Sequence, residues 1–280
     1  MIIPNYFILI VIYNKAPKDS TTILSLSQID NKFKPYIRCL ICDNSKNKLN
    51  PTQEDELKLM LKDIRYEYIY NNGLNKPLSK IYNETINKLL IHEYLIIFDD
   101  DSVFNSDLFE ESSNSISANK GINLFLPIVY DNEKIISPAI MKGFKGHYLK
   151  NIQPGVINSK NITAINSGMI IKGQYLKNKF IGYDERIKFY FTDNDFMYKF
   201  TLDNKALYIL NYKMHHTLNF YLRGESFEKK KKRFKDLRRS YLILMRRKGI
   251  FMYYITQIYL FIYSIKFSIQ QRDIRFIFVF

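Results

Sequence analysis

The sequence predicts an α/β fold built on a doubly wound, mostly parallel sheet that is flanked by helices. Apolar, strand-like runs alternate with helix-like segments from Phe7 to Phe98, which is the order typical of such folds. The first run, Phe7–Tyr13, is continuously apolar and rich in Ile, as expected for a strand buried on both faces. The 280 residues, 46% of them hydrophobic, suffice for one domain of moderate size and an appendage.

Each further element has its own local signal. Segment Thr52–Lys62 is predicted to be a helix with Thr52 as its N-cap and Asp55 three residues later. Segment Pro77–Leu90 carries an amphipathic helical pattern. The other predicted strands are Tyr36–Cys42, Arg65–Tyr70, Tyr94–Phe98, Asn123–Val129, Ala164–Ile171 and Ala206–Leu210, and the other predicted helices of this part are Thr21–Ile29 and Asp193–Leu202. Loops are expected between residues 130 and 163.

The last part of the chain differs in composition, so we place a domain boundary between 1–225 and 226–280. Much of the net charge of +15 lies in Glu228–Arg247, predicted to be a basic helix, and the aromatic segment Ile250–Phe280 follows it. Such a pairing suits an anionic membrane surface. A helical appendage packed on the first domain or on a second subunit is the alternative. No run reaches 18 consecutive apolar residues, so no membrane-spanning helix is expected.

Cysteine usage and the N-terminus favour a cytoplasmic protein. Cys39 and Cys42 are three residues apart on one predicted strand, so their side chains point to opposite faces and no disulfide is expected. The apolar run near the N-terminus has no basic segment before it and no small-residue cleavage site after it.

The strongest signal for chemistry is the run Asp99-Asp100-Asp101 at the end of an apolar strand. Adjacent carboxylates repel one another, which is tolerable only with solvent or a cation nearby. Ligands of open α/β sheets bind outside the carboxyl ends of the strands, and an Asp-x-Asp pair there offers oxygen ligands to Mg2+ or Mn2+ and to substrate phosphates through the metal. A solvated acidic turn is the alternative. The pair His215-His216 could complete such a metal site.

Weaker signals lie at other element ends. Asp43 ends the second strand, where it fits either a hydrogen bond to a base or ribose or an Asx-turn. Tyr13 and Asn14 end the first strand and suit either contacts with a base or a core tyrosine followed by a turn. Asp193 begins a helix, which suits either a general base or simple capping.

Taken in order, these segments carry a resemblance to a known family. They are Tyr13-Asn14, Cys42-Asp43-Asn44-Ser45, Asn72-Gly73 to Asn83, Phe98-Asp99-Asp100-Asp101-Ser102, Asn166-Ser167-Gly168-Met169, Gly182-Tyr183-Asp184-Glu185, Phe191-Thr192-Asp193-Asn194-Asp195-Phe196, His216-Thr217-Leu218 and Arg239-Ser240-Tyr241. Together they resemble glycosyltransferase family 2, the inverting enzymes of the GT-A fold, and most closely its rhamnosyltransferase-like branch of bacterial O-antigen and capsule clusters. Thr192 and Asn219 depart from the pattern, which usually has an acidic residue and a glycine there.

The resemblance implies a role for each matching residue. The catalytic base would be Asp193, and the metal ligands would be Asp101 and His216. The donor would be bound by Tyr13, Asn14, Asp43, Asn83, Asp99 and Asp100, and the acceptor side would include Ser167, Gly168 and Asp195.

The implied activity is transfer of a sugar, with inversion, from a dTDP- or UDP-linked donor to a lipid-linked saccharide during synthesis of a surface polysaccharide such as O-antigen. Mg2+ or Mn2+ is the implied cofactor, and the cytoplasmic face of the inner membrane is the implied location. The alternatives are a basic nucleic-acid-binding module, a nucleotidyltransferase and an inactive glycosyltransferase-like subunit. The acidic run argues against nucleic acid as a partner, residues 14–20 lack a phosphate loop, and the intact Asp99, Asp101 and Asp193 argue for an active enzyme.

Overall fold

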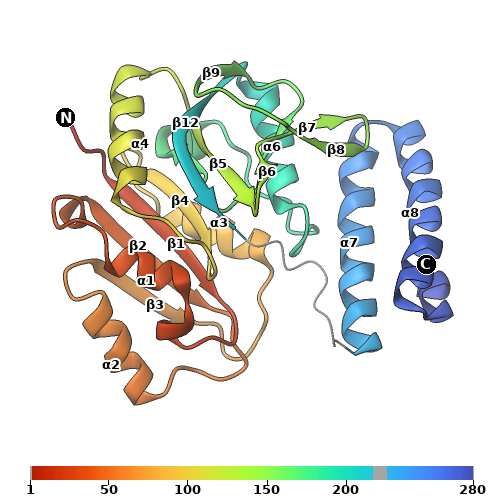
Figure 1. The fold of residues 1–280 in the computed structure, drawn as a ribbon, viewed down its shortest axis with the longest axis horizontal. Helices are drawn as coiled ribbons and strands as arrows, with labels where there is room; N and C mark the ends of the chain where they lie inside the picture. Colours follow the sequence, from red (N-terminus) through yellow and green to blue (C-terminus); the bar gives the residue numbers. More distant parts are fainter. Residues whose placement is uncertain (1, 217–225, 280) are drawn as a thin grey trace.

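The computed structural model describes residues 2–216 and 226–279, and its main body is a sheet with helices on both faces (Figure 1). In the first half of the chain the elements are β1 (Tyr6–Ile12), η1 (Pro17–Asp19), α1 (Thr21–Ser27), η2 (Lys34–Tyr36), β2 (Ile37–Asp43), α2 (Pro51–Met60), β3 (Arg65–Tyr70), α3 (Leu78–Lys88), β4 (Tyr94–Asp99), α4 (Ser106–Ala118) and β5 (Leu124–Asp131). The predicted alternation of strands and helices from the first to the fourth strand is confirmed.

The second half adds short strands and longer helices. The elements are β6 (Lys134–Ser137), β7 (Ala139–Lys142), β8 (Lys145–Tyr148), β9 (Gly155–Asn158), β10 (Ile162–Thr163), β11 (Ile170–Lys172), α5 (Gly173–Asn178), α6 (Thr192–Asp203), β12 (Ala206–His215), α7 (Phe227–Arg247), α8 (Ile250–Gln271) and η3 (Ile274–Val279). The stretch between residues 130 and 163, expected to be loops, thus forms several short strands. The strand predicted at Ala164–Ile171 is reduced to β11, and β12 continues five residues beyond its predicted end at Leu210.

The directions of the strands determine at which edge of the sheet their carboxyl ends lie. The main sheet of the described residues has the order β3-β2-β1-β4-β11-β5-β12-β9, with β6 paired to β5. Strands β1 to β4 are parallel to one another, β11 is antiparallel to both β4 and β5, and β12 is parallel to β5. Two reversals across β11 return β5 and β12 to the direction of β4. The carboxyl ends of β1, β2, β4 and β12 therefore lie at one edge, where ligands of such sheets bind.

The sheet is buried on both faces because its central strands are apolar throughout. In β1, Ile8 and Ile10 pack into the apolar layer beneath α1, α2 and α4, while Phe7 and Leu9 pack into the layer beneath α3, α5 and α6. All four side chains are at most 1% exposed. Continuous apolar sequence is what a strand between two helical layers requires.

Helix α2 starts one residue earlier than the prediction, and its cap is a different residue. Asn50 accepts a hydrogen bond from the backbone N–H of Gln53, and the Gln53 side chain accepts one from the backbone N–H of Asn50. Pro51 occupies the first helical turn, where its missing N–H is no loss. The predicted cap at Thr52 was therefore wrong, because the proline and the reciprocal bonds fix the helix start at Asn50.

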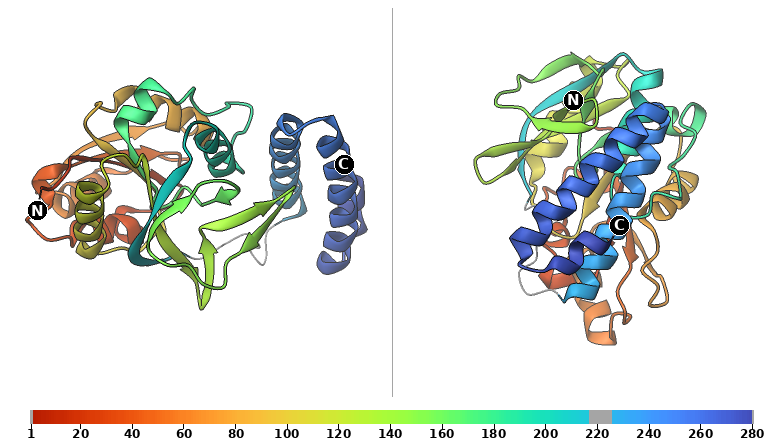
Figure 2. Two further views of the ribbon diagram at one scale, coloured as in Figure 1. Left: turned by 90° about the horizontal axis from the view of Figure 1, so that it is seen from above. Right: turned by 90° about the vertical axis from the view of Figure 1, so that its right-hand side faces the viewer.

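Helices α7 and α8 form a hairpin at one side of the molecule, with α7 toward the main body and α8 on the outside (Figures 1 and 2). The ring of Tyr241 on α7 stacks on Phe191 with centroids 4.8 Å apart, which joins the hairpin to the body. Within the described residues, α8 is long and apolar enough to cross a membrane, by length and composition alone. Counting unbroken apolar runs missed it because Thr256, Gln257 and Ser264 interrupt the run.

The start of α2 gives a direct test of local structure. We expect Asn50→Ala to lower the free energy of unfolding by about 1 kcal/mol, since it removes the side-chain oxygen that accepts from the Gln53 backbone N–H. Thr52→Ala is the matched control and should change the free energy by less than about 0.5 kcal/mol, because Thr52 is an exposed position within the helix. Urea unfolding of both variants measures the difference. Equal effects of the two substitutions would contradict the assigned cap.

Candidate functional site

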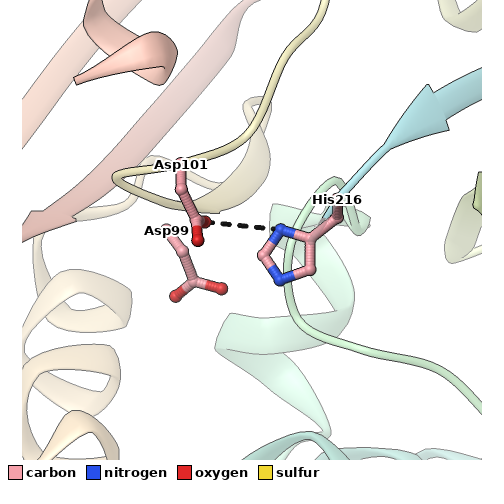
Figure 3. Close-up of side chains that lie close together, drawn as sticks. All are labelled: Asp99, Asp101 and His216. Atoms are coloured by element: carbon pink, nitrogen blue, oxygen red, sulfur yellow. Dashed lines mark ion pairs between the residues drawn. The ribbon is translucent and has the colours of Figure 1, made fainter. Parts of the chain in front are cut away.

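Two carboxylates and one imidazole converge at the edge of the sheet (Figure 3). Asp99 ends β4, Asp101 lies in the turn that follows, and His216 follows β12. One ligand atom from each of the three residues lies within 4.8 Å of the others. Strands β4 and β12 run in the same direction, so their carboxyl ends lie at the same edge. This brings His216 next to the two aspartates, which lie more than 100 positions earlier in the sequence. Of the two adjacent histidines it is His216 that faces the carboxylates, whereas the ring of His215 lies 6.1 Å from that of Tyr130.

The cluster fits a divalent cation. Asp101 Oδ1 and His216 Nδ1 lie 3.4 Å apart, and both atoms are shielded from solvent without a hydrogen-bond partner among the described residues. Burial raises the pKa of Asp99 to about 6, with His216 opposing this shift and Asp101 and Asp100 adding to it. Buried polar atoms without partners are costly, and a metal ion would satisfy them. Residues Thr217 and Leu218, which complete the predicted histidine motif, lie outside the described residues.

A network of hydroxyl groups holds the turn that carries Asp99 and Asp101. The Thr22 hydroxyl donates to the Asp99 carbonyl at 2.5 Å and accepts from the Ser102 backbone N–H at 2.8 Å. The hydroxyl groups of Ser102 and Ser167 are 2.5 Å apart, and Ser167 also accepts from the backbone N–H of Asp99 at 3.4 Å. Ser167 is 1% exposed. It therefore supports the turn from the protein interior, which differs from its predicted place facing the acceptor.

Gly168, the other half of the predicted acceptor-side pair, is a packing residue. Its φ of +85° lies in the left-handed region, and its N–H donates to the Ile97 carbonyl at 2.8 Å. A Cβ built here would lie 2.9 Å from both Met214 Cε and Pro127 Cγ. Only glycine fits this position, which keeps β12 close to β4.

The predicted donor residues at the first strand build a fixed loop. The Asn14 backbone N–H donates to Ser45 Oγ at 2.8 Å, which ties the ends of β1 and β2 together. Asp100 accepts from the Tyr13 backbone N–H at 3.0 Å and from Lys15 Nζ at 2.5 Å. The ring of Tyr13 is 51% exposed. Tyr13 is thus free to stack on a ligand, while Asn14 and Asp100 hold the backbone that presents it.

Asp43 and Asn83 have their polar atoms engaged within the protein. Asp43 is fully buried, and its two oxygens accept from the Ser45 backbone N–H at 2.8 Å and the Tyr68 hydroxyl at 2.5 Å. The first of these bonds is the Asx-turn that the sequence left open as an alternative. The Asn83 amide donates to and accepts from the backbone of Tyr183, at 3.0 and 2.7 Å. Both side chains therefore position neighbouring loops.

Asp193 stands in the first turn of α6 and borders an aromatic cavity of about 360 Å³. Its Oδ1 accepts from the Asn194 backbone N–H at 2.8 Å. Burial raises the pKa of Asp193 to about 6, and the negative charge of Asp99 adds to the shift, so the two carboxylates interact electrostatically. We name this hollow the aromatic cavity after its ring-bearing lining residues, which are Tyr148, Phe191, Tyr241, Tyr259 and Tyr263.

Asp195, two residues further along α6, faces a different environment. It is fully buried and accepts from Lys199 Nζ at 3.0 Å, from the Asp184 backbone N–H at 2.8 Å and from the guanidinium of Arg247. Residues two apart on a helix point in different directions, and of these two carboxylates Asp193 lines the aromatic cavity whereas Asp195 is not among its lining residues. Asp195 joins α6 to α7 through its ion pair with Arg247. Sequence reasoning missed Arg247, for which the only signal was the Arg246-Arg247 pair at the end of a basic helix.

The departure from the family pattern at Thr192 has a structural counterpart. The Thr192 hydroxyl accepts a hydrogen bond from Asn166 Nδ2 at 2.9 Å. The other amide atom, Asn166 Oδ1, is buried without a partner among the described residues. Thr192 thereby fixes the Asn166 side chain next to the start of α6, a contact that an acidic residue would also be able to accept.

The comparisons with known proteins concern the fold. No family model matches the chain, and no curated protein matches it. S. aureus TarS 1-349, solved in complex with UDP, is similar at a TM-score of 0.56 and 14% identity, covering 85% of this chain and 64% of that one. GalNAc-T7 with UDP, GalNAc and Mn2+ is similar at 0.59 and 13%, covering 79% and 45%. The mannosyltransferase PcManGT from Pyrobaculum calidifontis, in complex with GDP-Man and Mn2+, is similar at 0.57 and 11%, covering 92% and 70%.

These structures are glycosyltransferases, and the likeness establishes the GT-A type of fold that the sequence predicted. Against the TarS 1-349 structure the chain spans 64% of the other protein's length. The site described above lies at the edge of the sheet where the resemblance implied it.

The metal cluster predicts a ligand-dependent gain in stability. At a free Mn2+ concentration about 100 times the Kd, the folded state should gain about 2.7 kcal/mol, or roughly 5 to 10 °C in Tm. Asp101→Ala and His216→Ala should each abolish most of this gain, because each removes one of the three ligands. His215→Ala is the matched control and should retain it. A full Mn2+ shift in the His216 variant, measured by differential scanning fluorimetry, would exclude His216 as a ligand.

The raised pKa of Asp193 predicts a pH-dependent effect on stability. The folded pKa of about 6 lies above the ordinary value, so between about pH 4 and 6 the unfolded chain loses its proton first, and above pH 6 the folded state bears the full cost of a desolvated charge. Asp193→Asn should therefore raise the Tm at pH 7.5, on the order of 2–4 °C. The gain should vanish toward pH 4. A lower Tm of the variant at pH 7.5 would mean that the carboxylate stabilises the fold.

Proposed function

We propose that this chain is a metal-dependent, inverting glycosyltransferase that moves a sugar from a nucleotide-diphosphate donor to a hydroxyl group of a saccharide. The observation that carries the proposal is the adjacency of two sets of groups. A cluster suited to a cation, Asp99 with Asp101 and His216, interacts electrostatically with Asp193, a carboxylate with a pKa of about 6 beside the aromatic cavity. Donor activation and proton removal from an acceptor need such groups side by side.

Asp101 and His216 would hold the cation, which when bound neutralises negative charge on the leaving diphosphate. The chain's own part at the donor is to present these ligands on a turn braced by Thr22, Ser102 and Ser167. The exposed ring of Tyr13 offers a surface on which the nucleotide base stacks. The similar TarS, GalNAc-T7 and PcManGT structures hold UDP or GDP-Man, which supports a nucleotide donor.

Asp193 would act as the general base. As the acceptor oxygen forms its bond to the anomeric carbon, the bond from that carbon to the diphosphate oxygen breaks, and the acceptor's proton passes to the Asp193 carboxylate. One displacement from the face opposite the leaving group inverts the anomeric configuration. The rings that line the aromatic cavity suit the apolar faces of a sugar and leave its hydroxyl groups to polar partners.

The donor atoms favour Mn2+ over Mg2+ as the cofactor. Mg2+ takes oxygen ligands almost exclusively, whereas an imidazole nitrogen suits the later transition metals better. A site of two carboxylates and one imidazole lies between these preferences and suits Mn2+. Two of the similar structures, GalNAc-T7 and PcManGT, also contain Mn2+.

The proposal extends to the acceptor and to the biological setting. We propose a lipid-linked saccharide of a surface polysaccharide as the acceptor, at the cytoplasmic face of the membrane. The support is that Tyr259 and Tyr263 of the apolar helix α8 line the aromatic cavity, so the acceptor site lies beside that helix.

The test is a panel of UDP, dTDP and GDP sugars with Mn2+, followed by measurement of donor turnover. One donor should stabilise the wild type only when Mn2+ is present, and the chain should hydrolyse or transfer it. Asp193→Asn should keep the stabilisation and lose at least about a hundredfold in turnover, since it removes the base and leaves the donor site intact. Asp203→Asn, an exposed aspartate at the end of the same helix, is the matched control.

Two outcomes would contradict this proposal. Near-normal turnover of Asp193→Asn would remove Asp193 as the base. Absence of any nucleotide-dependent stabilisation in the wild type would favour the inactive-subunit or binding-module alternatives.

A further inference from the structure

Helix α8 is apolar on its exposed side as well as on its buried side. The buried side carries Thr256, Ser264 and Ser268, which are at most 4% exposed, together with Leu260 and Phe267. Its outward side is apolar, and its large side chains are between 37% and 73% exposed. We call this side the apolar face of α8, formed by Ile250, Phe251, Tyr254, Ile258, Phe261, Ile262, Ile265 and Ile269. Spacings of three, four and seven residues place them in one stripe along the helix.

This arrangement is typical of a helix in lipid and unfavourable in water. In soluble proteins the apolar stripe of a helix faces the core, and continuous exposed apolar surface marks a binding site. In membranes, small residues and Ser or Thr lie between helices while large apolar side chains point outward. The inner side of α8 is also well packed, since Phe267 stacks on Phe234 of α7 and meets Phe276 of η3 edge to face, at centroid distances of 5.7 and 4.9 Å. The apolar face is therefore the outer surface of a well-packed hairpin.

Positive charge lies at the margin of the apolar face. On α7, Lys230 faces α8, since its Nζ donates to Gln271 Oε1 at 2.7 Å, and Arg272 is exposed at the end of α8. Lys266 is exposed on α8 itself, at the margin of the apolar face. Clusters of lysine next to an apolar surface favour anionic headgroups.

We propose that the apolar face of α8 docks on the surface of an anionic lipid bilayer, with the helix lying in the plane of the interface. Helix α7 runs beside α8 and is too highly charged to enter hydrocarbon, and the shared apolar cluster around Leu244 and Leu260 holds the two helices together. An interfacial position satisfies both helices at once. If the proposed function holds, the aromatic cavity lies about one helix diameter, roughly 10 Å, from the membrane. The docking itself does not depend on that function.

Vesicle flotation of the full chain tests the proposal. The protein should float with vesicles of equal parts phosphatidylcholine and phosphatidylglycerol, and raising the salt concentration should weaken the binding. Binding to pure phosphatidylcholine should be weaker. The triple variant Phe251→Ser/Ile258→Ser/Ile262→Ser should bind at least about tenfold more weakly. Its Tm should remain near that of the wild type, because all three side chains are exposed.

The matched control is Leu59→Ser/Leu74→Ser/Ile181→Ser, which removes three apolar side chains of similar exposure, 73%, 70% and 85%, outside the hairpin. It should bind vesicles like the wild type. Lys266→Gln should weaken binding to anionic vesicles roughly fivefold and have little effect on binding to neutral ones.

Four results would overturn the proposal. The first is a wild type that stays in the aqueous fraction with both kinds of vesicle, and the second is equal loss of binding in the control and in the α8 variant. The third is a dimer in sedimentation equilibrium that the α8 variant dissociates, which would assign the face to a second copy of the chain. Retention in vesicles after alkaline carbonate extraction would replace interfacial docking by a spanning helix. None of these results depends on donor turnover, so they are separate from the test of the proposed function.

Discussion

The distribution of positive charge decides what the carboxylates of this site are able to do. The chain has 42 Lys and Arg residues against 27 Asp and Glu, so cations are in excess. The basic partners near the site are used as follows: Lys15 for Asp100, and Lys199 and Arg247 for Asp195. In the described part of the chain, Asp99, Asp101 and Asp193 have no Lys or Arg ion pair. Their charge is left to a cation and to a proton, which is what a transfer site requires and what a merely stable fold would avoid.

The first part of the fold, from β1 to β4, could be predicted because its signals are local. The run in β1 is buried on both faces, and the pattern of Pro77–Leu90 matches α3, so periodicity alone identifies them. The strands from β6 to β10 escaped prediction because each is four residues long or shorter, and their pairing depends on distant partners. The start of α2 was missed because Thr52 and Asn50 are both good caps, and the choice rests on Pro51 and Gln53.

The sequence indicates where candidate site residues lie along the chain, and the structure adds which groups their side chains contact. Asp101 and His216 meet as expected, because strand order fixes where the ends of β4 and β12 lie. Asp43 and Asn83 stand in matching motifs, yet their polar atoms are taken up by hydrogen bonds to neighbouring loops. A motif specifies a residue type at a place, and which group its side chain reaches depends on contacts such as that of Tyr68 with Asp43. That contact joins two strands and has no signature in sequence.

The hairpin of α7 and α8 is coupled to the reaction centre by the same helix that carries the proposed base. Arg247 at the end of α7 binds both Asp184 and Asp195, and Asp195 is two residues from Asp193 on α6. The stacking of Phe191 on Tyr241 adds a second link, at a residue whose φ of +67° is unfavourable for a bulky side chain. Backbone strain of this kind persists only where surrounding contacts enforce it. The position of Asp193 therefore depends on the hairpin of α7 and α8. A membrane surface that holds this hairpin in place would also hold the proposed base, Asp193, in place.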